Sequence, residues 1–547
     1  MCISRLKTIG LAALAALSLA TAQSTATTFR NPVLWEDYPD LDVFRVGDVY
    51  YYSSSTFAYS PGAPLLKSYD LVNWEPVTHS VPTLNFGAKY NLNGSGSAYV
   101  KGIWASTLRY KASSDTFIWL GCVEGRTYVW TAANTNASRN NGEVAPGAWD
   151  WKSQGTIPSC YYDSGLLIDD DDKMYVAHGN PRISVAQLSA DGKSQLSAPK
   201  VVYDPGNGAT VEGARMYKIK NTYYIFVTRP ADQEIVLKST TGPYGPYTAK
   251  MLVNRIAGPL SSAGFAHQGG IVDTPDGKWY YVAFLDAYPG GRIPVVAPLT
   301  WGSDGFPSVT VDAKGAWAQE YPLPVKTGKR VAPGPGTDEF KGKGLSAHWE
   351  WNHNPDNRKW KLLEEGGLVL QTADVTGDLF AAKNTLTRRI TGPKSSGTFR
   401  LDVSGMKDGD KAGAVMFRDR SAYIAVSKEG NASKIVMVTG VTLNQNWETS
   451  GRGSVVATGP TLTDANLKDV WFKMDADITP AFGTNTERTT TFSYSVDGGK
   501  TFVRLGPAFA MANSWQYFTG YRFGVFNHAT KALGGEVKVQ SFTLAMI

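Results

Sequence analysis

The sequence predicts an all-β protein in which a five-bladed β-propeller is followed by a β-sandwich. The first observation is a loose repeat, in which five segments begin with a polar residue and run about ten residues later into an aromatic-rich β pattern. The second is composition, since 56 glycines, 12% aromatic residues and frequent turn dipeptides favour strands over helices. The third is length, because 547 residues are too many for one ordinary core and suggest about two to three domains.

The repeats have the size of a propeller blade. Their polar residues are Asp40, Ser106, Asp163, Glu212 and His267. The residues that anchor the following β patterns are Tyr50, Phe117, Met174, Tyr223 and Trp279. These anchors are 67, 57, 49 and 56 residues apart, as expected for units of four strands. Since the first strand of each blade lines the central axis, the five polar residues should face the same point.

The strands of the propeller follow short alternating segments. Segments 49–53, 223–227 and 279–283 predict half-buried strands. Turns are expected at residues 47–48, 170–172 and 276–277, where Gly and Asp cluster. No helical period is sustained from residue 33 to about 325, which agrees with an all-β domain.

A linker and a second domain follow the propeller. Residues 326–337 are rich in Lys, Gly and Pro, with Pro-Gly-Pro-Gly at 333–336, and predict a linker. Residues 338–547 are again strand-like, for example at 367–371, 398–402 and 491–495, but they lack the polar repeat. We interpret them as a jelly-roll-like β-sandwich.

Two roles are open for the sandwich. It is either a carbohydrate-binding module or a structural buttress, and the short linker favours the buttress. The segment Ala512-Asn-Ser-Trp-Gln-Tyr517 presents two aromatic residues in a polar setting. We therefore consider Trp515 and Tyr517 as candidates to reach a polymer near the mouth of the site.

The N-terminus predicts secretion. Arg5 and Lys7 precede an apolar run that ends in Ala20-Thr-Ala22, so residues 1–22 have the layout of a signal peptide. The apolar run is too short for a typical membrane span, and no later run replaces it. We expect a secreted, extracellular monomer without a membrane partner, whose propeller domain occupies residues 23–325.

Charge and cysteine content restrict the partners. Removing Arg5 and Lys7 with the signal lowers the formal charge from +6 to +4, which is too mild to argue for nucleic acid. Cys122 and Cys160 then remain, and they are consistent either with one disulfide or with two buried thiols. Glycosylation is predicted at three Asn-Xaa-Ser sequences, which begin at Asn93, Asn136 and Asn431.

Three of the five polar residues are carboxylates: Asp40, Asp163 and Glu212. Carboxylates on the axis of a propeller repel one another and are costly to desolvate, so three together indicate a function. Glycoside hydrolysis uses such a set, with a protonated acid for the leaving oxygen and an ionised base for water. Neighbouring residues suit sugar binding by apolar faces or hydrogen bonds: Phe57, Trp104, Phe265, His267, Gln268 and Arg292.

Two other interpretations of the carboxylates are open. Any one of them alone is about as well explained by capping a strand or accepting backbone hydrogen bonds. All three could also belong to a sugar-binding propeller without catalysis, holding ligand hydroxyls or a cation. The complete set favours catalysis, because a lectin requires no protonated acid opposite a base.

Several motifs resemble glycoside hydrolase family 43. They are Asn31-Pro-Val-Leu, Pro61-Gly-Ala-Pro, Ser68-Tyr-Asp-Leu-Val-Asn-Trp74, Ile103-Trp-Ala, Glu212-Gly-Ala-Arg-Met-Tyr-Lys218, His267-Gln-Gly-Gly, Gly291-Arg-Ile-Pro and His348-Trp-Glu-Trp-Asn-His-Asn-Pro-Asp356. The last resembles the family's accessory domain, and the best match is to secreted fungal α-L-arabinofuranosidases acting on doubly substituted xylose of arabinoxylan. The chain departs from the family's frequent Trp-Ala-Pro-Asp, having Trp104-Ala-Ser-Thr107 in what we take as the pocket wall.

This resemblance implies roles for individual residues. Asp40 would be the general base, Glu212 the general acid and Asp163 an ionised modulator of the acid's pKa. The reaction would invert the anomeric carbon and need no cofactor. Arg292 would bond sugar hydroxyls, and His267 would face a structural calcium ion or a water in the channel, although calcium prefers oxygen ligands. A β-xylosidase on the same scaffold is the alternative activity.

Overall fold

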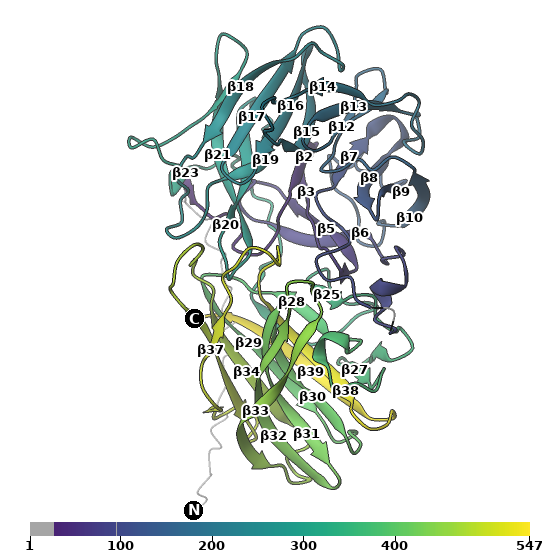
Figure 1. The fold of residues 1–547 in the computed structure, drawn as a ribbon, viewed down its shortest axis with the longest axis vertical. Coiled ribbons are helices and arrows are strands. Elements are labelled where there is room, and N and C mark those ends of the chain that lie inside the picture. Colours follow the sequence, from purple (N-terminus) through teal and green to yellow (C-terminus); the bar gives the residue numbers. More distant parts are fainter. Residues whose placement is uncertain (1–26, 95) are drawn as a thin grey trace, which may run out of the picture.

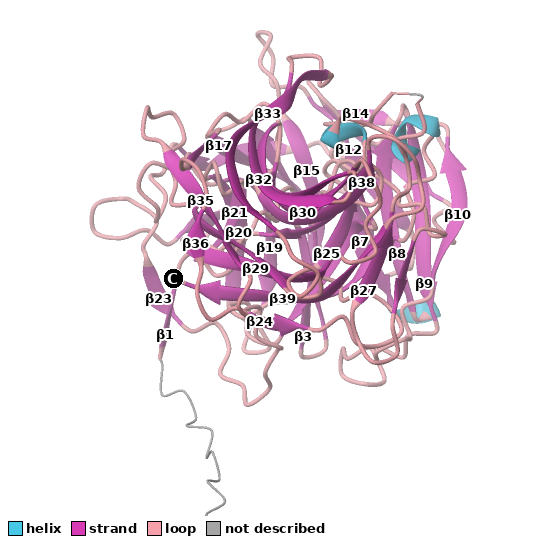
Figure 2. Cartoon of the chain, turned by 90° about the horizontal axis from the view of Figure 1, so that it is seen from below, coloured by secondary structure: helices cyan, strands magenta, loops and turns pink. Residues whose placement is uncertain are grey.

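The computed structural model describes residues 27–94 and 96–547 (Figure 1). The expected signal peptide and Ser95 of the first sequon therefore lie outside the described residues. Five four-stranded antiparallel sheets are followed by two larger sheets that pack on each other, so the predicted propeller and sandwich are both confirmed. Three short 3-10 helices are present in the described part, namely η1 (Ala88–Asn91), η2 (Ala112–Ser114) and η3 (Leu379–Ala381) (Figure 2).

Each blade is one contiguous stretch of chain. Blade 1 holds β2 (Asp42–Val46), β3 (Val49–Ser53), β5 (Gly62–Ser68) and β6 (Glu75–Val81). Blade 2 holds β7 (Thr107–Lys111), β8 (Thr116–Val123), β9 (Arg126–Ala133) and β10 (Trp151–Ile157). Blade 3 holds β11 (Gly165–Ile168), β12 (Met174–His178), β13 (Ile183–Leu188) and β14 (Lys200–Tyr203). Blade 4 holds β15 (Glu212–Ile219), β16 (Thr222–Arg229), β17 (Gln233–Ser239) and β18 (Thr248–Asn254). Blade 5 holds β19 (His267–Asp273), β20 (Trp279–Asp286), β21 (Arg292–Trp301) and β22 (Pro307–Val309).

The sandwich consists of two antiparallel sheets. One contains β24 (Gly336–Asp338), β26 (Trp360–Leu362), β27 (Leu368–Gln371), β29 (Lys394–Asp402), β34 (Val470–Asp477), β35 (Arg488–Ser495), β36 (Val503–Arg504), β37 (Phe509–Met511) and β39 (Glu536–Met546). The other contains β25 (Trp349–Asn352), β28 (Leu386–Arg389), β30 (Asp410–Phe417), β31 (Arg420–Glu429), β32 (Ala432–Leu443), β33 (Thr449–Thr461) and β38 (Arg522–Ala529), and is extended by β4 (Tyr59–Ser60) from blade 1.

The strand β3 corrects the expectation of half-buried blade strands. All five of its residues are buried. Tyr50 and Tyr52 belong to one hydrophobic cluster, whereas Val49 and Tyr51 belong to another on the opposite face. Because side chains alternate between the two faces of a strand, a sheet packed between neighbouring blades is apolar on both.

The propeller ring is closed by the chain before blade 1. The strand β1 (Thr28–Arg30) pairs with β23 (Glu320–Pro322), which follows blade 5. Beside it, the Asn31 side chain donates to Val296 O and accepts from Val296 N, both at 2.9 Å. This pair of hydrogen bonds to β21 explains the asparagine of the Asn-Pro motif.

The sandwich is joined directly to blade 1. β4 pairs with β25, and His353 N donates to Ala58 O at 3.0 Å. The linker is not free of structure at its end, since Gly336 and Thr337 already belong to β24 and pair with β39. No helix among the described residues is long and apolar enough to span a membrane.

A buried charge cluster holds this junction. Glu350 on β25 accepts from Arg389 at 2.8 Å and Arg522 at 2.6 Å, and lies 3.0 Å from His79 Nε2 of blade 1. Burial by itself would raise the pKa of Glu350, but the charges of Arg389 and Arg522 outweigh it and hold the pKa well below its ordinary value.

Replacing Glu350 by Gln should lower the free energy of unfolding by about 3–5 kcal/mol, because two buried guanidinium groups lose their counter-charge. Since the folded pKa is depressed, Glu350 stabilises the fold above the unfolded pKa of about 4.3, and that stabilisation is lost as the pH falls. Urea unfolding as a function of pH measures both effects. Glu339→Gln, which removes a carboxylate from the exposed pair with Lys341, is the control and should change stability by less than about 1 kcal/mol. An equal cost in both variants would contradict the prediction.

Candidate active site

A cleft of about 650 Å³ opens at the propeller axis, where the first strands of the blades begin. Asp40 precedes β2, Asp163 precedes β11, and Glu212 is the first residue of β15. All three carboxylates line the cleft. Loops of the sandwich form the rest of its wall through Trp447, Phe482, Trp515 and Phe518.

Asp40 is held as an ion pair. It is buried and has a left-handed backbone, with φ of 55°. Arg292 donates to both of its carboxylate oxygens, at 2.6 and 3.0 Å, and Ser55 donates a further hydrogen bond at 2.5 Å. A forked guanidinium fixes the plane of a carboxylate. These contacts therefore hold the Asp40 carboxylate in one orientation in the cleft.

Arg292 contacts the Asp40 carboxylate, where the family resemblance implied sugar hydroxyls. Besides its two bonds to Asp40, its Nε donates to Phe518 O of the sandwich at 3.1 Å. The rings of Phe57, Phe284 and Phe518 surround the guanidinium at 5.2–5.8 Å. Its backbone N–H donates to Asp37 at 2.8 Å. Arg292 of blade 5 thus contacts both Asp40, which precedes blade 1, and the sandwich.

Arg215 fixes the loops that carry the carboxylates. It is fully buried on β15 and donates to Ser106 O at 2.7 Å, Asp40 O at 2.8 Å and Ser164 O. These carbonyls belong to blades 2, 1 and 3, so one side chain from blade 4 ties four blades together. This explains the arginine in the Glu212-Gly-Ala-Arg motif.

Glu212 has the environment of an acid. Its Oε2 accepts from Asn180 Nδ2 at 2.5 Å, and the Tyr162 hydroxyl lies 3.5 Å away. Burial and the negative charge of Asp40 raise the pKa of Glu212, although the bond from Asn180 opposes this shift. A raised pKa keeps a proton available for a leaving oxygen.

Asp163 lies in the electrostatic field of the other two carboxylates. Burial and the charges of Glu212 and Asp40 raise the pKa of Asp163 well above its ordinary value, while Arg215 and Arg292 oppose the shift. The negative charge of Glu212 is one of these causes, so a change of charge on either carboxyl should shift the pKa of the other, and an ionised Asp163 stays a prediction. The Gln268 amide donates to Asp163 Oδ2 at 3.4 Å.

Asp163→Asn should move the alkaline limb of the rate profile to lower pH, with reduced activity. The change keeps the shape but deletes a negative charge beside Glu212, so the acid loses its proton more easily. The dependence of kcat/KM on pH measures this shift. If activity collapses while the limb stays in place, Asp163 instead orients the acid or binds sugar.

The other expected site residues divide into two groups. Phe57, Trp104, His267 and Gln268 line the cleft. Phe265 does not line it, and only its carbonyl takes part by accepting from His267 Nδ1 at 2.9 Å.

The surroundings of His267 do not fit a calcium ion bound by protein ligands. No group of three or more His, Cys, Asp or Glu in residues 27–94 and 96–547 is arranged to hold a metal. With Nδ1 directed to Phe265, His267 has only Nε2 left to offer, and calcium requires several oxygen ligands.

Several cleft residues were not anticipated from the sequence. They are Tyr162, Trp447, Phe482 and Phe518, and Asn180, which does not line the cleft, was also missed as a hydrogen-bond partner of Glu212. Tyr162 precedes Asp163 directly and packs edge-on against Trp104, with ring centroids 6.1 Å apart, so its position next to a candidate carboxylate was the available signal. The others lie on loops without a recognisable pattern. Of the two aromatic candidates in the sandwich, Trp515 lines the mouth and is 48% exposed, whereas Tyr517 is buried.

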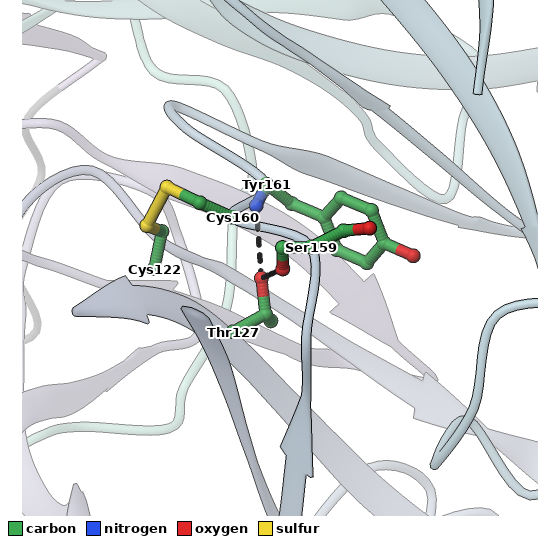
Figure 3. Close-up of a disulfide and its surroundings, with 5 residues drawn as sticks. All are labelled: Cys122, Thr127, Ser159, Cys160 and Tyr161. Atoms are coloured by element: carbon green, nitrogen blue, oxygen red, sulfur yellow. Dashed lines mark hydrogen bonds between the residues drawn. A yellow bond between two sulfur atoms is a disulfide. The ribbon is translucent and has the colours of Figure 1, made fainter. Parts of the chain in front are cut away.

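A disulfide anchors the segment before Asp163. Cys122 on β8 is bonded to Cys160, which resolves the two alternatives for these cysteines (Figure 3). Next to it, Thr127 Oγ1 donates to Ser159 O and accepts from Tyr161 N, both at 2.8 Å (Figure 3). These contacts fix the chain that leads into Tyr162 and Asp163.

The two residues that depart from the family's Trp-Ala-Pro-Asp, Ser106 and Thr107, lie behind the wall of the cleft, which corrects the expectation that the change lies in the wall itself. Trp104 and Ala105 line the cleft, but Ser106 and Thr107 do not. Thr107 is buried and donates to Asp42 at 2.7 Å, so this part of the change belongs to the packing of the channel.

Comparison with known proteins assigns the chain to a family. The family model for Glycosyl hydrolases family 43 matches residues 29–307, and that for the Beta xylosidase C-terminal Concanavalin A-like domain matches residues 337–545. The chain belongs to glycosyl hydrolase family 43. It is therefore a glycoside hydrolase.

Similar proteins cover nearly the whole chain. A beta-xylosidase of Formosa agariphila is 30% identical, over 94% of this chain and 90% of its own length. The non-reducing end alpha-L-arabinofuranosidase BoGH43B of Bacteroides ovatus is 25% identical, over 91% and 86%. A solved structure of an engineered family 43 enzyme, described as displaying both endo-xylanase and exo-arabinofuranosidase activity, is 66% identical with a TM-score of 0.94, covering 95% of this chain and 100% of that one.

Proposed function

We propose that this family 43 enzyme is a secreted, inverting, exo-acting α-L-arabinofuranosidase that releases arabinose side chains from arabinoxylan. The observation that carries the proposal is the cleft itself, in which an ion-paired Asp40 and an acid with a raised pKa, Glu212, share one aromatic-walled space. The 66% identity to an engineered enzyme described as displaying both endo-xylanase and exo-arabinofuranosidase activity supports the choice of sugar.

The proposed mechanism assigns one proton transfer to each carboxylate. Glu212 donates its proton to the glycosidic oxygen, and Asp40 removes a proton from a water that attacks the anomeric carbon from the opposite side. Direct attack inverts the configuration at that carbon and leaves no covalent intermediate. This chemistry requires no cofactor.

The substrate is proposed to be a xylose unit that carries two arabinose groups. The cleft volume of about 650 Å³ lies within the range of sites for ligands larger than one pentose. The sandwich lines the same space, which allows the polymer to be bound by both domains, with Trp515 as an exposed stacking surface. In this proposal the sandwich binds substrate and is more than a structural buttress.

A β-xylosidase is the second candidate, because the Formosa relative and the family model of the sandwich both carry that name. Aryl α-L-arabinofuranoside and aryl β-D-xyloside, assayed separately, distinguish the two activities. Linkage assignment of arabinoxylan before and after digestion then tests the substrate, and we expect loss of arabinose from doubly substituted xylose only. Turnover of the xyloside alone would favour the second candidate.

A further inference from the structure

The strand β19 contains a bulge at Gln268. The register with β20 shifts between His267 and Gly270, and Gln268 has a left-handed backbone with φ of 49°. A Cβ at Gly269 would lie 2.3 Å from the Tyr281 ring, and one at Gly270 would lie 2.6 Å from the Tyr217 hydroxyl. The two glycines of His267-Gln-Gly-Gly therefore admit two tyrosines. The bulge removes the Gln268 N–H from the ladder, so that group needs another partner.

Glu234 supplies that partner from the neighbouring blade. It lies on β17 and is fully buried, and its Oε2 accepts from Gln268 N at 2.9 Å. Burial raises the pKa of Glu234 to about 8, although the N–H groups of Gln268 and Gly269, the Tyr281 hydroxyl and the charge of Arg215 oppose the shift. Burying a carboxyl is costly unless it is hydrogen-bonded, and the bond from Gln268 N to Glu234 anchors the bulge from the side of blade 4.

We propose that Glu234 is a positioning residue for hydrolysis, which fixes the Gln268 bulge so that the Gln268 amide is directed at Asp163. Two hydrogen bonds connect Glu234 to Asp163 through Gln268. Glu234 holds Gln268 N, and Gln268 Nε2 donates to Asp163 Oδ2 at 3.4 Å. This inference rests on the proposed roles of Asp163 and Glu212.

The physical consequence concerns the shared proton. Asp163 faces Glu212, Asp40, Arg215 and Arg292, and the Gln268 amide adds a hydrogen bond to its ionised form. That bond favours a charged Asp163 and so leaves the proton on Glu212. Without the Gln268 bond, Asp163 and Glu212 together hold their proton to higher pH. The proton then lies more often on Asp163, from which it does not reach the leaving oxygen.

Glu234→Ala should therefore lower kcat on the order of 10- to 100-fold and move the alkaline limb to higher pH. This direction is opposite to the one expected for Asp163→Asn. Gln268→Ala should give the same shift, and the double variant should lose no more than the larger single loss, because both act through one contact. Glu234→Gln, which keeps the shape and an acceptor oxygen, should recover most of the lost activity.

Val236→Ala is the matched control, since Val236 is buried on the same face of β17 two residues further on. It should lower the melting temperature without moving the pH profile.

An unshifted profile in Glu234→Ala and Gln268→Ala, or fully additive losses, would overturn the inference. If Glu234→Ala does not fold, the pH profile of Gln268→Ala still decides it. Full activity of Asp163→Asn and Glu212→Ala would instead refute the proposed function.

Discussion

Asp40→Asn should lower kcat by about 1,000- to 10,000-fold across the whole pH range, because it removes the general base while keeping the shape of the side chain. Asparagine cannot accept a proton from water at any pH of interest. It also leaves the Arg292 guanidinium, which now pairs with both Asp40 oxygens, as a buried charge without a counter-ion. We therefore expect a second, smaller effect on stability.

Three measurements separate these effects. Steady-state rates give the loss of turnover, thermal unfolding gives the stability, and proton NMR of the first product of the wild-type enzyme gives the stereochemistry. The β anomer from an α-linked substrate is expected if Asp40 activates water directly. Asp276→Asn, in the exposed turn between β19 and β20, is the matched control and should leave turnover unchanged. An α anomer as first product would rule out the base role.

Glu212→Ala should nearly abolish the hydrolysis of natural arabinosides, with a loss of about 1,000-fold or more, but should cost at least about tenfold less with an activated aryl leaving group. A basic alkoxide needs a proton in order to leave, whereas a stabilised phenolate departs without one. The structure supports this role through the raised pKa of Glu212 and its contacts with Asn180 and Tyr162.

The comparison of the two leaving groups is the decisive readout. Equal losses on both substrates would assign Glu212 to binding or to structure. Asn180→Ala removes a bond that opposes the raised pKa and leaves the acid in place. Its alkaline limb should move to higher pH, without the dependence on leaving group expected for Glu212→Ala.

Several parts of the fold could be predicted from local sequence. The start of each blade falls within two residues of Asp40, Ser106, Asp163, Glu212 or His267, because the strand pattern and its turns are encoded within a few residues. Residues 326–337 were predicted as a linker, but the last two of them pair with β39, about 200 residues further along the chain. Pairing over that distance leaves no mark in local composition.

The sequence by itself determined the blade repeat, the two domains and the three carboxylates at the axis, since each follows from residue type and spacing along the chain. Only the tertiary structure decided which charges meet, such as the fork between Arg292 and Asp40, which are 252 residues apart. It also decided that Trp447 and Phe518 of the sandwich line the cleft and that Phe265 does not. The physical reason is that burial, ion pairing and hydrogen bonding depend on distances in space, and those distances exist only after the blades and the sandwich have packed.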